Sequence, residues 1–325
     1  MSMNAKALVL GASGGIGGET ARQLVAEGWQ VHALSRRATS MPAIPGITWV
    51  PGDAMSPDDV RRAAAGCRLI LHAVNPPGYR NWHQLVLPMI DATIAAAHAT
   101  GATILLPGTI YNYGSDACPI LTETSPQHPD TAKGAIRAEM ERRLQRAADG
   151  GVRSIVLRAG DFFGPRPGNN WFSQCLVQPG RPVRRVIHPG RPGIGHQWTY
   201  LPDMAATFLR LVAIRDRLPA FTTLHMAGHW DPDGTAMTTA IARAAGRPVR
   251  IRRLPWRMLG LAAPFVPLIR NLREMRHLWQ MPIRMSNDRL LALIGVEPHT
   301  PLDEAVRRTL TGLGCLPPAQ TSQPG

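Results

Sequence analysis

Residues 5–17 read AKALVLGASGGIG, an apolar run that passes directly into a glycine-rich turn. The run predicts a buried β-strand, and the spacing of the apolar residues that follow predicts a helix over residues 17–27. Gly11 would permit a tight turn, Gly14 would let the backbone approach a pyrophosphate, and Gly17 would allow close helix–sheet packing. The helix N-terminus would then face the anion. The motif predicts a dinucleotide site built from Gly11, Ser13, Gly14, Gly15, Ile16 and Gly17.

The alternation of strand and helix continues along the first half of the chain. Further strands are predicted at residues 30–34, 47–50, 69–72, 103–106 and 154–158, and further helices at 57–65, 82–98, 132–147, 237–245 and 302–310. Continuously apolar strands that alternate with helices indicate an α/β fold, a Rossmann-type doubly wound parallel sheet with helices on both faces. In such folds, ligands bind at the carboxyl ends of the strands.

The residues after the second predicted strand indicate which cofactor is bound. An acidic residue at this place usually holds the ribose hydroxyls of NAD, but this chain has Ser35, Arg36 and Arg37 there. A carboxylate would repel a 2′-phosphate, whereas a guanidinium binds one with two hydrogen bonds, so NADP is expected rather than NAD. Arginine is common in the chain, so chance placement is the alternative. Asp53, expected to bond the adenine amino group, and Ala73 complete the predicted cofactor site.

The regular alternation ends after Gly164-Pro165, where proline and glycine become frequent. We therefore expect an NADP-binding Rossmann domain over residues 1–165 and a smaller substrate-binding region over residues 166–315. Residues from about 196 to 218 are expected to return to the Rossmann domain. The last residues, 316–325, are expected to form a flexible tail.

The composition excludes several classes of protein. The 325 residues include 36 basic and 22 acidic ones, a formal net charge of +14, and 34 of the basic residues are arginines. These are scattered without an aromatic-interleaved stripe, so no nucleic-acid partner is expected, although clusters at 181–185, 250–253 and 270–276 could meet an anionic ligand. Four cysteines without paired spacing and isolated histidines predict no disulfides and no metal site. A cytoplasmic location is therefore expected.

The longest strongly apolar stretch is Met258–Ile269, which holds twelve residues with two prolines and is flanked by arginines. It is too short to span a bilayer. A buried or lid helix and contact with a membrane surface both stay open for it. We expect a monomer or homodimer that acts on a small-molecule substrate.

Further motifs along the chain are similar to those of one enzyme family. They are Gly52-Asp53, Tyr113-Gly114, residues 157–165, residues 200–205 and residues 300–305. With the glycine motif, they make the chain resemble the extended short-chain dehydrogenase/reductase family, of the NAD-dependent epimerase/dehydratase type. The resemblance covers nearly the whole chain and implies an oxidoreductase.

The resemblance also implies catalytic positions. Family members carry a Ser or Thr five residues before the glycine of the Tyr-Gly pair, which is Thr109 here. Either the Thr109 hydroxyl binds the substrate oxygen, or this threonine only caps a loop. The family's Tyr-x-x-x-Lys element occurs nowhere in this chain. When Glu141 is aligned with an acid that often follows the family's lysine, Lys133 replaces the tyrosine and Arg137 replaces the lysine.

This replacement alters the expected chemistry. Arg137 can hold ribose hydroxyls but keeps its proton. Lys133, one of two lysines in the chain, can act as proton donor, and repulsion from Arg137 one turn away would make its amine easier to deprotonate. Isoflavone-reductase-like relatives are similar in using a lysine near this place. The alternative is that Lys133 is a surface lysine on a degenerate helix and that Tyr111 is the proton donor. Tyr113, the other tyrosine nearby, is expected to pack structurally.

Substrate contacts are expected at the carboxyl edge of the sheet and in the second region. The candidates are Asn75, Tyr111, Phe163, Asn170, Trp171 and Trp198. The aromatic ones could equally belong to the core. We expect an NADPH-dependent reductase of a small carbonyl or conjugated substrate. A sugar-nucleotide epimerase or dehydratase is one alternative, since Asn169-Asn170 resembles a diphosphate-binding spot of such enzymes. An NADPH-sensing binding protein without catalysis is the other.

Overall fold

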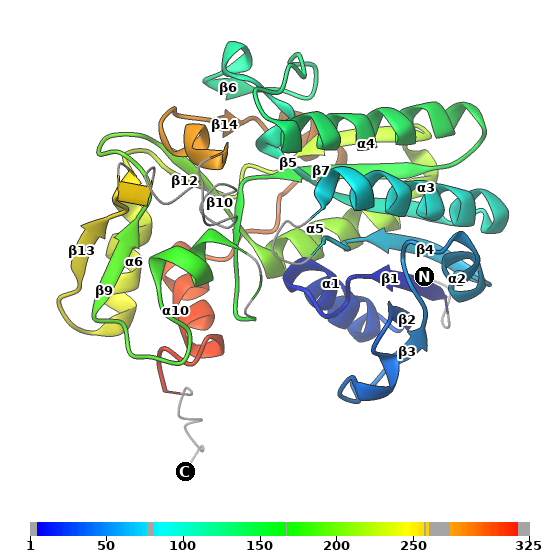
Figure 1. The fold of residues 1–325 in the computed structure, drawn as a ribbon, viewed down its shortest axis with the longest axis horizontal. Helices are drawn as coiled ribbons and strands as arrows, with labels where there is room; N and C mark the ends of the chain where they lie inside the picture. Colours follow the sequence, from blue (N-terminus) through cyan, green and yellow to red (C-terminus); the bar gives the residue numbers. More distant parts are fainter. Residues whose placement is uncertain are drawn as a thin grey trace.

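The computed structural model describes residues 5–76, 81–166, 168, 170–256, 258–259 and 274–317. The main sheet has seven strands in the order β11-β7-β5-β4-β1-β2-β3 (Figure 1). They are β1 (Lys6–Leu10), β2 (Gln30–Ser35), β3 (Ile47–Pro51), β4 (Cys67–His72), β5 (Thr103–Thr109), β7 (Ser154–Ala159) and β11 (Phe221–His225). Every neighbouring pair in this sheet is parallel. The predicted doubly wound parallel sheet is confirmed.

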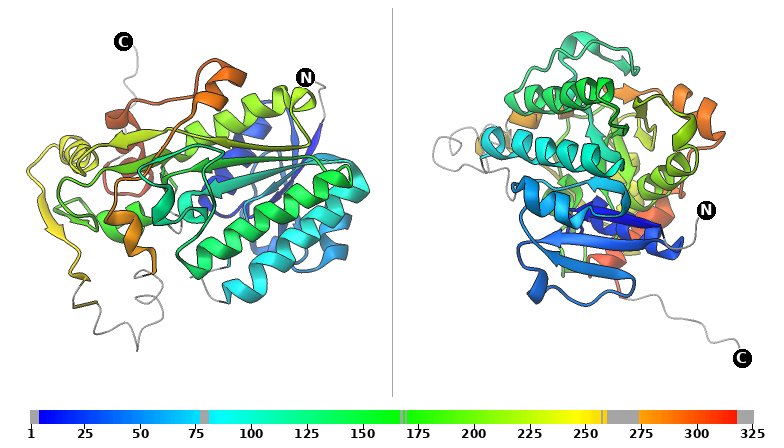
Figure 2. Two further views of the ribbon diagram at one scale, coloured as in Figure 1. Left: turned by 90° about the horizontal axis from the view of Figure 1, so that it is seen from above. Right: turned by 90° about the vertical axis from the view of Figure 1, so that its right-hand side faces the viewer.

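Helices cover both faces of the main sheet (Figure 2). One face packs on α1 (Gly15–Ala26) and α5 (Leu201–Ala213) through a core that includes Leu24 and Phe208. The other face packs on α2 (Pro57–Ala63), α3 (Trp82–Thr100) and α4 (Ala132–Asp149). Burial of both faces explains why the strands are continuously apolar rather than alternating.

Local sequence signals fix where several helices begin. The Ser56 hydroxyl accepts a hydrogen bond from the Asp59 N–H at 3.2 Å, and Pro57 occupies the first helical position of α2. The Thr131 hydroxyl accepts from the Gly134 N–H at 3.0 Å at the start of α4. By contrast, α1 starts at Gly15 without a side-chain cap.

The strand order reverses between β1 and β4. From β1 the chain builds outward through β2 and β3, and it then returns to form β4 on the other side of β1. The connections after β1 and β4 therefore diverge, and the crevice at the carboxyl ends of these two strands is where ligands bind in doubly wound sheets.

A smaller lobe lies on the side of the main sheet where the strands end (Figure 1). It contains the sheet β12-β10-β8 and the pairs β13-β9 and β14-β6. These strands are β6 (Ile120–Leu121), β8 (Asp161–Phe163), β9 (Arg185–His188), β10 (His196–Tyr200), β12 (His229–Asp231), β13 (Arg250–Arg253) and β14 (Arg284–Met285). The lobe's helices include α6 (Ala236–Ala245) and α10 (Leu302–Gly312), whereas α9 (Asp288–Ile294) packs Leu290 into the core of the main sheet. The lobe closes over an aromatic core that includes Trp171, Trp198 and Trp279.

The chain passes between the two parts more than once. After β10, helix α5 packs against α1, and β11 then adds to the main sheet beside β7. The rest of the chain returns to the smaller lobe through β12 and α6.

In the part of the chain described, no helix combines the length and the apolar composition needed to cross a bilayer. Of the stretch Met258–Ile269, only Met258 and Leu259 are described, and the remainder lies outside the described residues. The described residues also contain no group of three or more His, Cys, Asp or Glu side chains placed to hold a metal ion.

Candidate cofactor and catalytic site

The glycine turn after β1 is shaped by close backbone contacts. Gly11 has a φ of +91°, and a Cβ at this residue would lie 2.4 Å from the carbonyl oxygen of Ala73, after β4. A Cβ at Gly17 would lie 2.2 Å from the carbonyl oxygen of Gly11. Only glycine therefore fits at these two positions, and the absence of side chains draws the turn, α1 and the β4 end together.

The start of α1 fits a dinucleotide pyrophosphate. Gly14 is the N-cap, and no side chain accepts from the first amides of the helix within the described residues. These amides, with the positive end of the helix dipole, match an anionic oxygen. Ser13 and Gly14 are exposed, while Gly15 and Ile16 are half-buried. The turn thus presents an accessible backbone surface with unpaired donors.

The segment that carries Asn170 lies against this turn. A Cβ at Gly168 would meet the Gly15 amide nitrogen at 3.6 Å. The Asn170 side-chain oxygen accepts from the backbone N–H of Ser173 at 2.9 Å, which holds the segment in place. Asn169 lies outside the described residues.

The end of β2 carries an exposed guanidinium. The Ser35 hydroxyl accepts from the Arg37 N–H at 3.1 Å, and Arg36 Nη1 lies 3.9 Å from Asp53 Oδ2. The Arg36 side chain is 71% exposed, so this contact leaves most of its donors accessible. The Asp53 carboxylate also accepts from the Met55 N–H at 3.0 Å, which fixes the loop after β3.

Thr109 stands at the carboxyl end of β5. Its hydroxyl accepts from the Tyr111 N–H at 3.2 Å and lies 3.4 Å from Asn112 Oδ1, so Thr109 caps the short 3-10 turn Ile110–Asn112. A Cβ at Gly134 would lie 2.2 Å from the Tyr111 carbonyl oxygen, so the first turn of α4 packs directly on this 3-10 turn. The structure therefore brings Thr109, Tyr111 and Lys133 to one end of the sheet.

Lys133 is buried, and a carboxylate from the distant segment at residue 274 holds it. The Lys133 ammonium pairs with Glu274 Oε2, and the Lys133 backbone N–H donates to Glu274 Oε1 at 3.1 Å. The Lys133 side chain is 6% exposed and the Glu274 side chain is 24% exposed. A surface lysine is therefore wrong for this position. The ammonium faces, in addition to Arg137, an opposite charge that was not foreseen from the sequence.

Arg137 lies one turn further along α4, beside the end of β4. Its guanidinium sits 5.1 Å from the centre of the Trp82 ring, a cation–π contact. Burial, helped by the charge of Arg137, lowers the pKa of His72, the last residue of β4, to about 3. His72 Nδ1 lies 2.7 Å from the Thr93 hydroxyl. The guanidinium is thus placed near the crevice where β1 and β4 diverge.

Tyr113 belongs to a buried charged network rather than to the open edge. Its hydroxyl bonds His225 Nε2 at 2.7 Å and accepts from Arg158 Nη1 at 2.5 Å. Arg158 in turn donates to both oxygens of Glu141, at 2.5–3.2 Å. Burial raises the pKa of the Tyr113 hydroxyl. Glu141 therefore anchors β7 to α4, and Tyr113 packs structurally.

The aromatic substrate candidates lie deep in the smaller lobe. Phe163 and Trp198 are fully buried and Trp171 is nearly so, all in the aromatic core. The Trp171 and Trp279 rings meet edge to face, with centroids 5.4 Å apart. Asn75, after β4, has a buried side-chain oxygen with no partner among the described residues.

Sequence reasoning missed Glu274. It lies 141 residues from Lys133 along the chain, so no local pattern joins the two. One signal was available, because Glu274 is the single acidic residue between Asp233 and Asp288, in a region rich in arginine.

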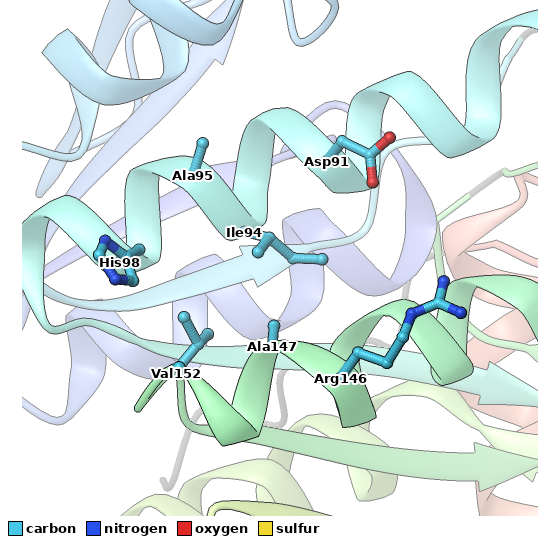
Figure 3. Close-up of a pocket in the computed structure, with 8 residues that line it drawn as sticks. Asp91, Ile94, Ala95, His98, Arg146, Ala147 and Val152 are labelled. Carbon is cyan, nitrogen blue, oxygen red and sulfur yellow. The ribbon is translucent and has the colours of Figure 1, made fainter.

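A hollow of about 430 Å³ lies away from these residues, between α3 and α4 (Figure 3). Ile94, Ala95 and His98 of α3 face Arg146 and Ala147 of α4 there. None of the predicted site residues lines this hollow. It is near Val152, which precedes β7, and therefore at the amino end of the sheet.

Comparison with known proteins agrees with this geometry. Residues 11–144 match the model of a family described as NAD(P)H-binding. Residues 11–144 form an NAD(P)H-binding domain. The match spans the glycine turn, Arg36, Asp53, Thr109, Lys133 and Arg137.

Solved structures share the fold over nearly the whole chain. A candidate epimerase from Burkholderia cenocepacia is 21% identical with a TM-score of 0.77, covering 97% of this chain and 100% of that one. The UDP-glucose 4-epimerase of Thermus thermophilus, solved with NAD, is 20% identical with a TM-score of 0.71, covering 95% and 98%. The NAD(P)H-binding domain and the smaller lobe thus have the fold of NAD-dependent epimerases.

A shorter match links the chain to a reductase. Over 73 residues it is 34% identical to the 2-alkyl-3-oxoalkanoate reductase of Shewanella oneidensis. The match covers 22% of this chain and 19% of the reductase. The chain therefore matches about a fifth of that protein's length.

Proposed function

We propose that this protein is an NADPH-dependent reductase of a small carbonyl or conjugated substrate. The observation that carries the proposal is the buried ion pair of Lys133 and Glu274 beside Thr109. The pair fixes the position of the Lys133 amine, so that it can act as a hydrogen-bond donor at the carboxyl edge of the sheet. Reduction of a carbonyl needs such a donor at the oxygen.

Each residue of the edge has a role in this proposal. The Thr109 hydroxyl and the Lys133 ammonium bind the substrate oxygen, and Lys133 gives it a proton. Glu274 positions the amine, and Arg137 holds the ribose hydroxyls of the cofactor. When bound, NADPH supplies the hydride. Tyr111 is the second candidate for the donor, since its backbone lies against the start of α4.

The preference for NADPH is supported by the end of β2. Arg36 presents an exposed guanidinium there, and Ser35 and Arg37 complete a short polar turn. A 2′-phosphate would gain a charge-assisted contact with Arg36, and Asp53 would remain for the adenine amino group.

The class of substrate is supported by the reductase match. The name of that relative describes a 3-oxo acid, in which one carbon that bears an alkyl group separates the ketone from the carboxylate. The aromatic candidates Phe163, Trp171 and Trp198 are buried in the core of the smaller lobe and are therefore not proposed as substrate contacts. Asn75 and Asn170 would add polar contacts.

A sugar-nucleotide epimerase is the second candidate, because a solved structure of this fold, 17% identical with a TM-score of 0.74, contains UDP-glucose and NAD. Oxidation of a sugar hydroxyl needs a base that takes up a proton. The chain has no Tyr-x-x-x-Lys element to supply that base, which is why the reductase is preferred.

One experiment separates the candidates. Purified protein is first tested for retained NAD, and NADPH oxidation is then followed with aldehydes, ketones, 3-oxo acids and enones. Turnover with a carbonyl and no retained cofactor supports the reductase. Retained NAD with interconversion of UDP-sugars supports the epimerase. NADPH binding with neither activity would identify a cofactor-sensing protein and refute both enzymes.

A further inference from the structure

A basic surface lies at the edge of the smaller lobe, on the strand pair β9–β13. β13 pairs in parallel with β9, with Arg250 opposite Arg185 and Arg253 opposite His188 (Figure 1). We call residues 181–193 and 247–258 the arginine ribbon. Its described arginines, all exposed, are Arg181, Arg184, Arg185, Arg191, Arg247, Arg250, Arg252 and Arg253. Neither segment contains an acidic residue.

The arginines elsewhere on the surface differ from those of the ribbon. On α2, Arg61 and Arg62 pair with Asp58 and Asp59 at 2.7 Å. On α4, one acid, Glu139, receives three arginines. Among the residues that the structure describes, no ribbon arginine has an ion-pair partner. A general preference for arginine explains the number of these residues but not the local lack of acids.

Backbone contacts hold the ribbon in shape. Arg253 Nη1 donates to the Gly190 carbonyl at 2.6 Å, and Arg247 Nε donates to the Val183 carbonyl at 3.0 Å. The Trp256 indole N–H donates to the Pro189 carbonyl at 2.8 Å. The two segments are therefore joined, and the other arginines extend from a fixed frame.

Large apolar side chains are exposed among these arginines. Ile251, between Arg250 and Arg252, is 55% exposed, and Met258 is 71% exposed. A surface that combines unpaired cations with exposed apolar side chains matches the interface of an anionic bilayer, where the cations meet phosphate groups and the apolar groups enter the acyl boundary. A nucleic acid would use the cations but gain nothing from Ile251 and Met258.

We propose that the arginine ribbon docks the protein on membrane surfaces that contain anionic phospholipids. This inference is independent of the reductase assignment. The docked face lies at β13, on the far side of the smaller lobe from β2 and β3 (Figure 1), so a cofactor at the carboxyl edge of the main sheet stays accessible in the docked protein.

The test is sedimentation of the full chain with phosphatidylcholine vesicles, with and without phosphatidylglycerol. We expect binding only to the anionic vesicles, weakened by salt. Because each arginine near an anionic surface is worth about fivefold in binding, R250E/R252E should lose at least roughly 25-fold. The matched control R68E/R217E makes the same change in charge at two exposed arginines of the main-sheet domain and should bind as the parent does. Thermal unfolding of both variants checks that they fold.

Ile251→Ser separates a bilayer from other polyanions. It should weaken vesicle binding at raised salt and leave any binding to heparin or duplex DNA unchanged. The proposal is overturned if the parent does not sediment with anionic vesicles, or if the control loses as much binding as R250E/R252E. It is also overturned if Ile251→Ser binds vesicles as the parent does while duplex DNA binds as tightly as the vesicles.

Discussion

The contact between Lys133 and Glu274 can be tested by Glu274→Gln, which keeps the shape and removes the charge. At an effective dielectric constant of about 20, two unit charges ~3 Å apart attract by roughly 5 kcal/mol. The Lys133 side chain is buried, but Glu274 is 24% exposed, so water recovers part of the loss. We therefore expect the free energy of unfolding to fall by about 2–3 kcal/mol, near the lower limit for a broken buried pair.

Urea denaturation of a double-mutant cycle measures this contact. The variants are Glu274→Gln, Lys133→Met and the combination of both. If the pair is formed, the second change should cost much less once the first is present, with a coupling of about 1.5–3 kcal/mol. Additive costs would show that the two side chains do not interact, and the assignment of Glu274 would be refuted.

The same variants distinguish a proton donor from a structural lysine. Lys133→Met should lower turnover by roughly 10²–10⁴, with NADPH affinity nearly unchanged. Glu274→Gln should lower turnover less than Lys133→Met does, because the amine is kept and only its positioning is weakened. Arg137→Met should weaken cofactor binding instead. Normal turnover of Lys133→Met would refute Lys133 as the proton donor and leave Tyr111 as the candidate.

Three further predictions concern the cofactor and the buried histidines. Arg36→Asp should reverse the preference for NADPH over NADH, with a loss of roughly 1.5–3 kcal/mol for NADPH in a fluorescence titration; equal affinities in the parent would contradict it. A Cβ at Gly14 meets only the Gly11 carbonyl, at 3.3 Å, so Gly14→Ala should fold normally. It should nevertheless bind NADPH at least roughly tenfold more weakly, because the new methyl group lies where the pyrophosphate approaches the backbone. The control Gly150→Ala should bind NADPH as the parent does. Burial lowers the pKa of three histidines, His72, His225 and His229, to about 3 or about 4. The free energy of unfolding should therefore keep its full value above pH ~6.5 and fall below that pH by up to roughly 4 kcal/mol per pH unit. The reason is that, as the pH falls, the unfolded chain takes up these three protons before the folded chain does. Urea midpoints that do not change between neutral and mildly acidic pH would contradict this.

Six of the seven main-sheet strands could be predicted because their apolar runs are local. The seventh, β11 (Phe221–His225), was missed: it reads FTTLH, has no continuous apolar run and follows residues 196–218, where the return to the Rossmann domain was expected to end. Among the predicted strands, β5 differs most, predicted to end at Leu106 but continuing to Thr109. Pro107 cannot donate a hydrogen bond and looks like a strand breaker. It nevertheless lies opposite Leu157 of β7, and the strand continues through it to place Thr109 at the edge.

The smaller lobe could not be predicted in the same way. Its strands have two to five residues and are separated by proline and glycine, which leaves too few positions for a period to appear. β13 reads RIRR and has no buried residue, so no apolar pattern marks it as a strand. Its partner β9 lies more than sixty residues earlier, and only the folded chain brings them together.

Both residues of the family's Tyr-x-x-x-Lys element are replaced in this chain, by Lys133 and Arg137, and the two replacements together change which groups the catalytic edge offers. In the family that the chain resembles, a cation lies beside a tyrosine hydroxyl and favours loss of its proton. Here an anion, Glu274, pairs with the ammonium of Lys133. Arginine at position 137 cannot exchange a proton with either. Under the proposed assignment, the edge therefore offers an ammonium donor at the place where the family has a tyrosine. The reaction should be easier to observe as reduction of a ketone by NADPH than as oxidation of the corresponding alcohol by NADP, and equal rates in the two directions at neutral pH would contradict this assignment.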